Sequence, residues 1–177
     1  MPLPSNAHPV FVKLLKEYKN HEIRYPQLKA VTCAQWGLES GWGTSGLAKH
    51  HFNFGGAKWR PYMNPWASPV SYKAHDGETI YCEFDTLGDW INGYWGRFIK
   101  ERAYKGWDTH TKTAENFITF IGPIWLGMGD AKGDEYVLKV LRIMDYYKLE
   151  DEFDTEKKNE IPQYSLDDLA REFPNRL

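Results

Sequence analysis

Helical periodicity dominates this sequence, and one short stretch of alternating periodicity interrupts it. Apolar side chains recur at three- and four-residue spacing in five stretches, which is typical of helices that bury one face. Residues 70–84 alternate apolar with polar side chains around an Asp76-Gly77 turn signal, which predicts one hairpin. The pattern therefore predicts a single α+β domain that is mostly helical. The predicted helices span residues 8–20, 26–40, 86–99, 113–121 and 134–147.

The second predicted helix has clear signals at both of its ends. Pro26 suits the first turn of a helix, where an amide hydrogen is not needed. Gly41 and Gly43 follow the last apolar residue, as glycine commonly does past a helix end. These signals place Glu39 in the last turn of the helix, next to a loop.

Proline and charge set the expected boundaries in the last third of the chain. The helix that begins at Thr113 is expected to break at Gly122-Pro123, because proline lacks the amide that a helix interior uses. The stretch 150–160 is strongly charged, which predicts a solvated linker, and Ser165 with Asp168 predicts the cap of a final short helix. The expected organisation is a folded domain over residues 1–150, then a charged linker and short helix over residues 151–177.

Residues 41–69 show no sustained period, which predicts a long ordered loop. Connections of this length without secondary structure are uncommon in compact domains unless they serve a function. Aromatic residues make up 16% of the chain, and several lie in predicted loops, where they could present a platform to sugar rings or nucleobases. These residues are Trp59, Tyr62, Trp66, Trp107 and Trp125.

The charge balance separates these two classes of ligand. The chain has 22 basic and 24 acidic side chains and a net charge of −2, so it lacks the basic surface expected of a nucleic-acid or anionic-membrane binder. No run of about 18 apolar residues is present, so no membrane insertion is expected. Sugars are therefore the favoured ligands.

Neither the cysteines nor the histidines form a metal-binding pattern. Cys33 and Cys82 lack the spacing of a zinc site, and we expect two free, buried thiols. His50 and His51 are adjacent and do not face one site on a helix, so hydrogen-bonded or solvated side chains are expected. The sequence predicts neither a metal nor a cofactor.

Glu39 is the residue best placed for acid chemistry. Cleavage of a glycosidic bond needs an acid, and a carboxyl group serves at neutral pH only where a dry environment raises its pKa. Trp36, Leu38 and Trp42 are neighbours in sequence, and the negative end of the helix dipole disfavours the ionised carboxylate. Position alone does not distinguish this role from that of a solvated glutamate at a helix end.

A family resemblance adds to this interpretation. Residues 34–43 read Ala-Gln-Trp-Gly-Leu-Glu-Ser-Gly-Trp-Gly, which resembles the signature of the glucosaminidases of glycoside hydrolase family 73. Three further segments resemble the family's motifs in the same order, and together the match covers roughly residues 10–150. The segments are Leu47 to Lys58, Tyr81 to Asp89 and Tyr136 to Leu149.

The resemblance implies a lysozyme-like fold, in which a helical core and a small β-hairpin lobe flank a glycan groove. It implies hydrolysis of the β-1,4 bond after N-acetylglucosamine in peptidoglycan, with Glu39 as the general acid. It also implies that Asn53, Phe54 and Gly55 line the groove. Trp42, Trp59, Tyr72 and Tyr136 are further expected sugar contacts, and Trp125, which stands about where the family has a tyrosine, is expected to stack on a sugar.

The family's second acidic residue lies in the hairpin lobe, where the resemblance is weaker. Its usual position falls near Lys73, which is not acidic. Asp76, Glu78 and Glu83 are the nearby carboxylates, and Glu78 is the predicted partner because it follows the turn. A distant carboxylate would activate water and invert the anomeric centre. Alternatively, the N-acetyl group of the substrate could attack, and this second mechanism is favoured.

Other functions remain open at this stage. A lytic transglycosylase would share the fold class and also use one glutamate, and a non-catalytic domain could bind glycan through the same aromatic residues. The N-terminus shows no signal-peptide pattern, so we expect synthesis in the cytoplasm and action on the cell wall. Release by a phage, as an endolysin, and delivery by a secretion machine, as an antibacterial effector, both fit. A delivered effector would also bind an immunity or carrier protein.

Overall fold

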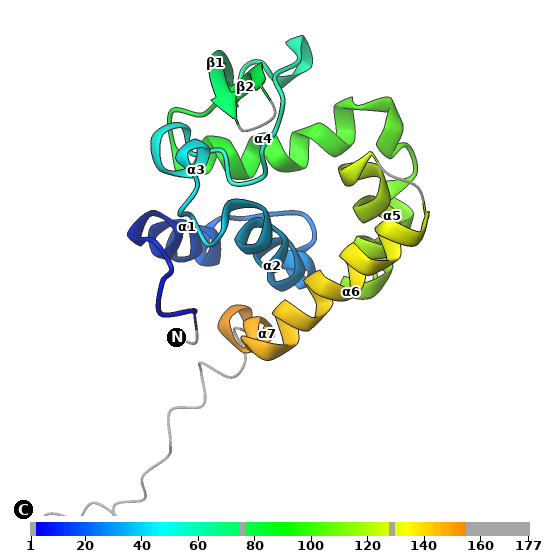
Figure 1. Cartoon of the computed structure of the whole chain (residues 1–177). Coiled ribbons are helices and arrows are strands. Elements are labelled where there is room, and N and C mark those ends of the chain that lie inside the picture. The colour runs from blue at the N-terminus through cyan, green and yellow to red at the C-terminus, as the bar shows by residue number, and fades with distance from the viewer. Residues whose placement is uncertain (1–2, 75–76, 128–129, 155–177) are drawn as a thin grey trace, which may run out of the picture.

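The computed structural model describes residues 3–74, 77–127 and 130–154 and shows helices that surround a central helix, with a hairpin on one side (Figure 1). This architecture confirms the predicted α+β, mostly helical class. The helices are α1 (Pro9–Asn20), α2 (Lys29–Ser40), α3 (Gly46–His51), α4 (Leu87–Lys100), α5 (Ala114–Leu126), α6 (Asp130–Tyr146) and α7 (Leu149–Phe153). Short 3-10 helices span Pro26–Leu28, Pro61–Met63, Arg102–Tyr104 and Trp107–His110, and the strands are β1 (Ser68–Ala74) and β2 (Gly77–Glu83).

Helix α2 lies at the centre of the core. Its residues from Lys29 to Gly37 are all buried, because α1, α5, α6 and α7 pack around it. Trp36 is completely buried, and its ring centroid lies 4.6 Å from that of Tyr18, 5.5 Å from that of Trp90 and 5.0 Å from that of Tyr94. A helix that is buried on all sides is held rigidly, so the residues at its end have a fixed position.

The predicted helix ends are confirmed where polar caps or glycine mark them. Gly41 ends α2 in the left-handed conformation with φ of +57°, which glycine adopts without strain. The hydroxyl of Thr86 accepts a hydrogen bond from the amide of Asp89 at 3.0 Å, and Thr113 caps α5 in the same way. These caps account for the correct prediction of where α4 and α5 begin.

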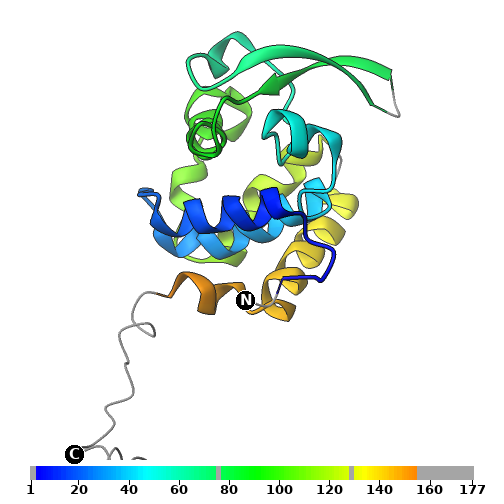
Figure 2. The same cartoon turned by 90° about the vertical axis from the view of Figure 1, so that its left-hand side faces the viewer.

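The hairpin is confirmed, and it stands above α3 and α4 (Figures 1 and 2). Its strands are antiparallel, with Val70 opposite Tyr81 and Tyr72 opposite Thr79. Since side chains alternate between the two faces of a strand, Tyr72 and Tyr81 share one face of the hairpin. The amide of Phe84 donates to the carbonyl of His51 at 3.0 Å, which joins the base of the hairpin to the end of α3.

The predicted loop over residues 41–69 contains a helix that periodicity did not reveal. Helix α3 has six residues, too few to show a repeating apolar face. Its start does carry a signal, because the hydroxyl of Ser45 accepts a hydrogen bond from the amide of Ala48 at 3.2 Å. The expectation of a structureless connection is therefore wrong for residues 46–51.

Helix α5 does not break at Gly122-Pro123 but continues to Leu126. Pro123 gives up one backbone hydrogen bond, yet its ring packs against Gly133 of α6, where a side-chain carbon would come within 2.7 Å of the proline ring. Burial of Ile118 and Ile121 holds the helix against its neighbours. Tertiary packing thus overrides the local breaking signal.

The chain also remains folded past the expected domain boundary at residue 150. Helix α7 packs its buried Leu149 into the core, and the ring of Phe153 lies 5.6 Å from that of Tyr18. Helix α6 likewise begins at Asp130, four residues before the predicted start. The rest of the predicted linker and the predicted C-terminal helix lie outside the described residues.

Both cysteines are buried and unpaired with each other, as expected. Burial raises the pKa of each thiol to about 12, so both are protonated at neutral pH. Among the described residues, no helix has the length and apolar character needed to cross a bilayer.

Candidate active site

Glu39 lies at the meeting point of two hollows in the protein surface. One hollow, of about 550 Å³, runs between α3, the hairpin and the end of α5, and the other, of about 330 Å³, lies against α6. Glu39 and Leu126 line both hollows, and we refer to the two hollows together as the groove. The first hollow is lined by Ser45, Gly46, Leu47, Gly55, Gly56, Tyr72, Lys73, Tyr81 and Trp125, and the second by Leu38, Lys132, Glu135, Tyr136 and Lys139.

A chain of hydrogen bonds fixes the Glu39 carboxyl group. The hydroxyl of Tyr136 donates to Oε1 of Glu39 at 2.5 Å. The amide nitrogen of Gln35 donates to the Tyr136 oxygen at 3.1 Å, and the hydroxyl of Tyr94 donates to Oε1 of Gln35 at 2.5 Å. Every donor points toward the glutamate, and the chain joins helices α2, α4 and α6 at this point.

Burial raises the pKa of the Glu39 carboxyl above its ordinary value of 4.5, and the hydrogen bond from Tyr136 partly opposes the rise. The last turn of α2 adds the negative end of the helix dipole, which also disfavours the ionised form. The result is a carboxyl group that keeps its proton to higher pH than a solvated glutamate. It can therefore donate that proton to a ligand in the groove.

Aromatic rings and glycines shape the walls of the groove beside Glu39. Gly55 lies under the ring of Trp125, where a side-chain carbon would come within 2.7 Å of the indole. The Tyr72 hydroxyl lies directly over Gly46, within 2.0 Å of where a side-chain carbon would stand. The guanidinium of Arg97 lies 5.0 Å from the centroid of Trp125 and holds this ring in place.

The structure brings four of the predicted sugar contacts, Gly55, Tyr72, Trp125 and Tyr136, to the groove. Their role as substrate contacts stays a prediction.

Other expected contacts are buried below the groove rather than exposed in it. Phe54 has no exposed surface and packs in the core, which corrects the expectation that its side chain lines the groove. Asn53 is also buried: its amide donates to the carbonyls of Ala57 and Cys82, both at 2.9 Å, and so ties the loop to β2. These two side chains support the groove from beneath.

Trp42 and Trp59 lie away from the two hollows. The ring of Trp42 packs between those of Phe11 and Tyr147, at centroid distances of 5.2 Å and 4.9 Å. The amide of Trp59 donates to the carbonyl of Ile80 at 3.1 Å, which holds the loop along the hairpin. Neither residue lines the hollows that contain Glu39, and their role as substrate contacts stays a prediction.

The predicted acidic partners in the hairpin lie in different places. Glu78 is exposed, accepts a hydrogen bond from Ser71 and lies on the face of the hairpin opposite to Tyr72. Glu83 lies at the hairpin base, where its carboxylate is 2.8 Å from Nδ1 of His51. Neither Glu78 nor Glu83 lines the two hollows. Asp76 lies outside the described residues. The catalytic role of Glu78 stays a prediction.

Gln35 and Glu135 are among the residues of the site that sequence reasoning missed. Gln35 stands one helical turn before Glu39 within the matched motif, and this spacing could have identified it as a neighbour on the same face. Glu135 lines the hollow against α6, but nothing local in the sequence connects it with α2. In the part of the chain that the structure describes, no cluster of three or more histidine, cysteine or acidic side chains could hold a metal ion.

A partly buried, hydrogen-bonded glutamate at the end of a central helix, beside a groove under a small hairpin, is the arrangement expected of the general acid in a lysozyme-like glycosidase. The glucosaminidase family model, described as mannosyl-glycoprotein endo-beta-N-acetylglucosaminidase, matches residues 15–149. The chain belongs to this glucosaminidase family, and the resemblance to glycoside hydrolase family 73 is confirmed.

Solved structures share the fold at low sequence identity. The catalytic domain of the autolysin Auto from Listeria monocytogenes is 16% identical, with a TM-score of 0.55 over 86% of this chain and 90% of that one. An N-acetylmuramoyl-L-alanine amidase from Staphylococcus aureus is 17% identical, with a TM-score of 0.62 over 87% of this chain and 45% of that one. No curated protein sequence gives a significant match. The lysozyme-like fold is thus confirmed.

Proposed function

We propose that this protein is an endo-β-N-acetylglucosaminidase that hydrolyses the β-1,4 bond after N-acetylglucosamine in peptidoglycan. The observation that carries the proposal is the Glu39 carboxyl group, which is partly buried, hydrogen-bonded by Tyr136 and shared by the two hollows. Membership of the glucosaminidase family supports glycoside hydrolysis, and the likeness to an autolysin domain supports peptidoglycan as the substrate.

Glu39 acts as the general acid in this proposal. Its neutral carboxyl donates a proton to the glycosidic oxygen while the bond between that oxygen and the anomeric carbon breaks. Trp125 and Tyr72 offer aromatic surface on the hollow beside α3, where the sugar rings would lie. Tyr136 holds the carboxyl in a fixed orientation, and Gln35 and Tyr94 hold Tyr136.

The nucleophile in the proposed reaction is the substrate's own N-acetyl group. Its carbonyl oxygen bonds to the anomeric carbon as the leaving group departs, and water then opens this ring and returns a proton to Glu39. Two observations support this choice over a hairpin carboxylate: neither Glu78 nor Glu83 lines the two hollows, and Glu83 is paired with His51. Glu135 is the other carboxylate among the described residues that line the two hollows.

Analysis of the digestion products tests which bond is cleaved. Purified peptidoglycan is digested, the new ends are reduced with borohydride, and the fragments are identified by mass spectrometry. The proposal predicts reduced N-acetylglucosamine at the new ends. Reduced muramic acid at the new ends would mean that the bond after N-acetylmuramic acid is cleaved instead. Anhydro-muramic ends would mean that the protein is a lytic transglycosylase. Binding to the wall without release of fragments would mean that it is a glycan-binding domain.

Glutamine variants of the remaining carboxylates test the nucleophile. Substrate assistance predicts that Glu78→Gln and Glu135→Gln each keep the rate within about threefold, because neither carboxylate acts in the reaction. It also predicts that the first product keeps the β-configuration, which proton NMR of fresh digests can detect. A loss of about 100-fold or more in either variant, with an α-anomer as the first product, would show that water is activated by a carboxylate instead.

Replacement of Tyr136 by phenylalanine is expected to move the alkaline limb of the pH–rate profile to higher pH. The hydrogen bond from Tyr136 lowers the pKa of Glu39, so its loss leaves the effect of burial unopposed and raises the pKa further. Activity of the protonated acid then persists to higher pH, while the maximal rate falls by about 10- to 100-fold because the carboxyl is less well oriented. Profiles of kcat/KM for both proteins measure the shift, and an unchanged or acid-shifted limb would contradict this account of Tyr136.

A further inference from the structure

A separate pocket lies beside α4. It has a volume of about 600 Å³, and none of its lining residues contributes to either hollow that contains Glu39. Its walls come from the connection between α1 and α2, from the loop before β1, from α4, and from the segment 105–108. The volume falls in the range of ordinary small-ligand sites.

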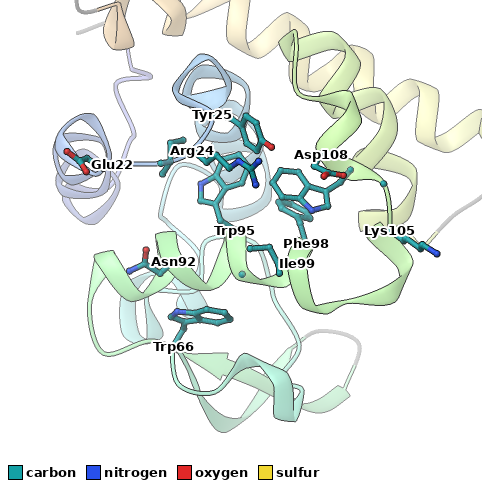
Figure 3. Close-up of a pocket in the computed structure, with 14 residues that line it drawn as sticks. Glu22, Arg24, Tyr25, Trp66, Asn92, Trp95, Phe98, Ile99, Lys105 and Asp108 are labelled. Carbon is teal, nitrogen blue, oxygen red and sulfur yellow. The ribbon is translucent and has the colours of Figure 1, made fainter.

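Aromatic rings make the walls of this pocket, and they include two of the tryptophans that the sequence placed in loops. Figure 3 shows Tyr25 and Trp66 on opposite sides of Trp95. The ring centroid of Trp107 lies 5.5 Å from that of Tyr25 and 6.0 Å from that of Trp95. Gly96 admits the Trp66 indole, because a side-chain carbon there would lie 2.2 Å from the ring. Packed rings of this kind offer a preformed surface with little entropy left to lose on binding.

Polar side chains stand at the edge of these rings. Figure 3 shows the ends of Arg24 and Asp108 beside the rings, while the charged ends of Glu22 and Lys105 point outward. The amide oxygen of Asn92 is 3.0 Å from Nε2 of His21, so its amide hydrogens are the part that can serve a ligand. The pocket thus combines aromatic faces with a guanidinium, a carboxylate and an amide.

The charged side chains that line the pocket indicate which class of ligand it can bind. Arg24 and Asp108 cancel each other, so the pocket has no net charge to attract the phosphates of a nucleotide. The Arg24 guanidinium already lies 5.3 Å from the centroid of the Tyr25 ring, which disfavours a second cation against that ring. A neutral pyranose ring matches both features, because its C–H face packs on indole while its hydroxyl and acetamido groups hydrogen-bond to the rim.

We infer that this pocket is a second glycan-binding site, which holds a peptidoglycan strand at a distance from the one being cleaved. The inference takes its ligand class from the proposed function. Two sites on one molecule keep an enzyme attached to an insoluble polymer, because release from one site leaves the other bound. The second site would therefore raise the affinity of the protein for the wall and leave the rate of the chemical step at Glu39 unchanged.

Binding to purified insoluble peptidoglycan tests the inference in a Glu39→Gln background, where no strand is cut. Trp66→Ala and the double variant Arg24→Ala with Asp108→Ala are each expected to weaken binding about tenfold. The double variant changes exposed side chains only, so it serves if Trp66→Ala fails to fold. Tyr146→Ala, an exposed aromatic residue outside the pocket, is the matched control and should bind as the parent does.

Turnover of a soluble tetrasaccharide of the glycan strand separates this site from the groove. With Glu39 restored, the pocket variants should cleave the tetrasaccharide at the parent rate and show a raised KM on insoluble wall only. Unchanged wall binding in both pocket variants would overturn the inference. It would also be overturned if free stem peptides competed with the wall for the protein while peptide-free glycan did not. If the parent cleaves no glycan but binds wall through this pocket, the proposed function fails while the second site stands.

Discussion

Glutamine in place of Glu39 is expected to lower the rate of wall hydrolysis by about 10²- to 10⁴-fold, which is the usual contribution of a positioned acid or base. Glutamine keeps the size of the side chain and can still accept a hydrogen bond from Tyr136. It has no acidic proton, so the leaving oxygen would depart unprotonated. Loss of turbidity of a suspension of purified walls, followed over time, measures the effect.

The fold should survive this substitution, so the loss can be assigned to chemistry. The melting temperature of the variant should match that of the parent or exceed it, because a partly buried group that can ionise is replaced by one that cannot. Glu115→Gln, an exposed carboxylate in the first turn of α5, is the matched control and should lyse walls at the parent rate. Near-full activity of Glu39→Gln would remove the residue from the mechanism.

Truncation of Trp36 to alanine is expected to destabilise the protein by about 3 to 5 kcal/mol, the range measured for large aromatic residues in cores. Trp36 has no exposed surface, and its ring meets those of Tyr18, Trp90 and Tyr94. Its removal leaves a cavity in the helix that positions Glu39. Because whole domains are stable by only about 5 to 15 kcal/mol, this loss would remove a large part of the free energy of unfolding.

Urea denaturation followed by circular dichroism measures this loss. Tyr146→Ala removes an aromatic ring that is 78% exposed, and its free energy of unfolding should change by no more than about 0.5 kcal/mol. The two variants therefore compare the same kind of truncation in the core and on the surface. A change below about 1 kcal/mol for Trp36→Ala would mean that α2 is not the centre of the core.

Local signals predicted the parts of the fold that local interactions determine. Gly41, Thr86 and Thr113 mark helix ends through their own backbone preference or hydroxyl groups, and the structure confirms all three. Pro123 gave the wrong expectation, because its cost is offset by packing against Gly133, which is ten residues away in the chain. Helix α3 escaped detection because one and a half turns carry no period.

In the candidate site, too, local sequence signals identified some residues, while others are brought together only by tertiary contacts. The motif around Glu39 identified the glutamate because acid, helix end and glycine lie within a few residues of one another. Gln35 and Tyr94 support it through a hydrogen bond that links α2 with α4, and no local pattern reports such a contact. Phe54 lies next to a groove residue in sequence, yet its side chain turns into the core.

Titration of the Glu39 carboxyl group shows whether this side chain is the general acid. The side-chain carboxyl carbons of glutamate are labelled with ¹³C, the Glu39 signal is assigned by its absence in Glu39→Gln, and its pKa is measured by NMR. A general acid at this position is expected to have a pKa above the ordinary value of 4.5, and that pKa should coincide with the alkaline limb of kcat/KM for hydrolysis. A Glu39 carboxyl that titrates at its ordinary pKa, with an activity limb elsewhere, would contradict its role as the general acid.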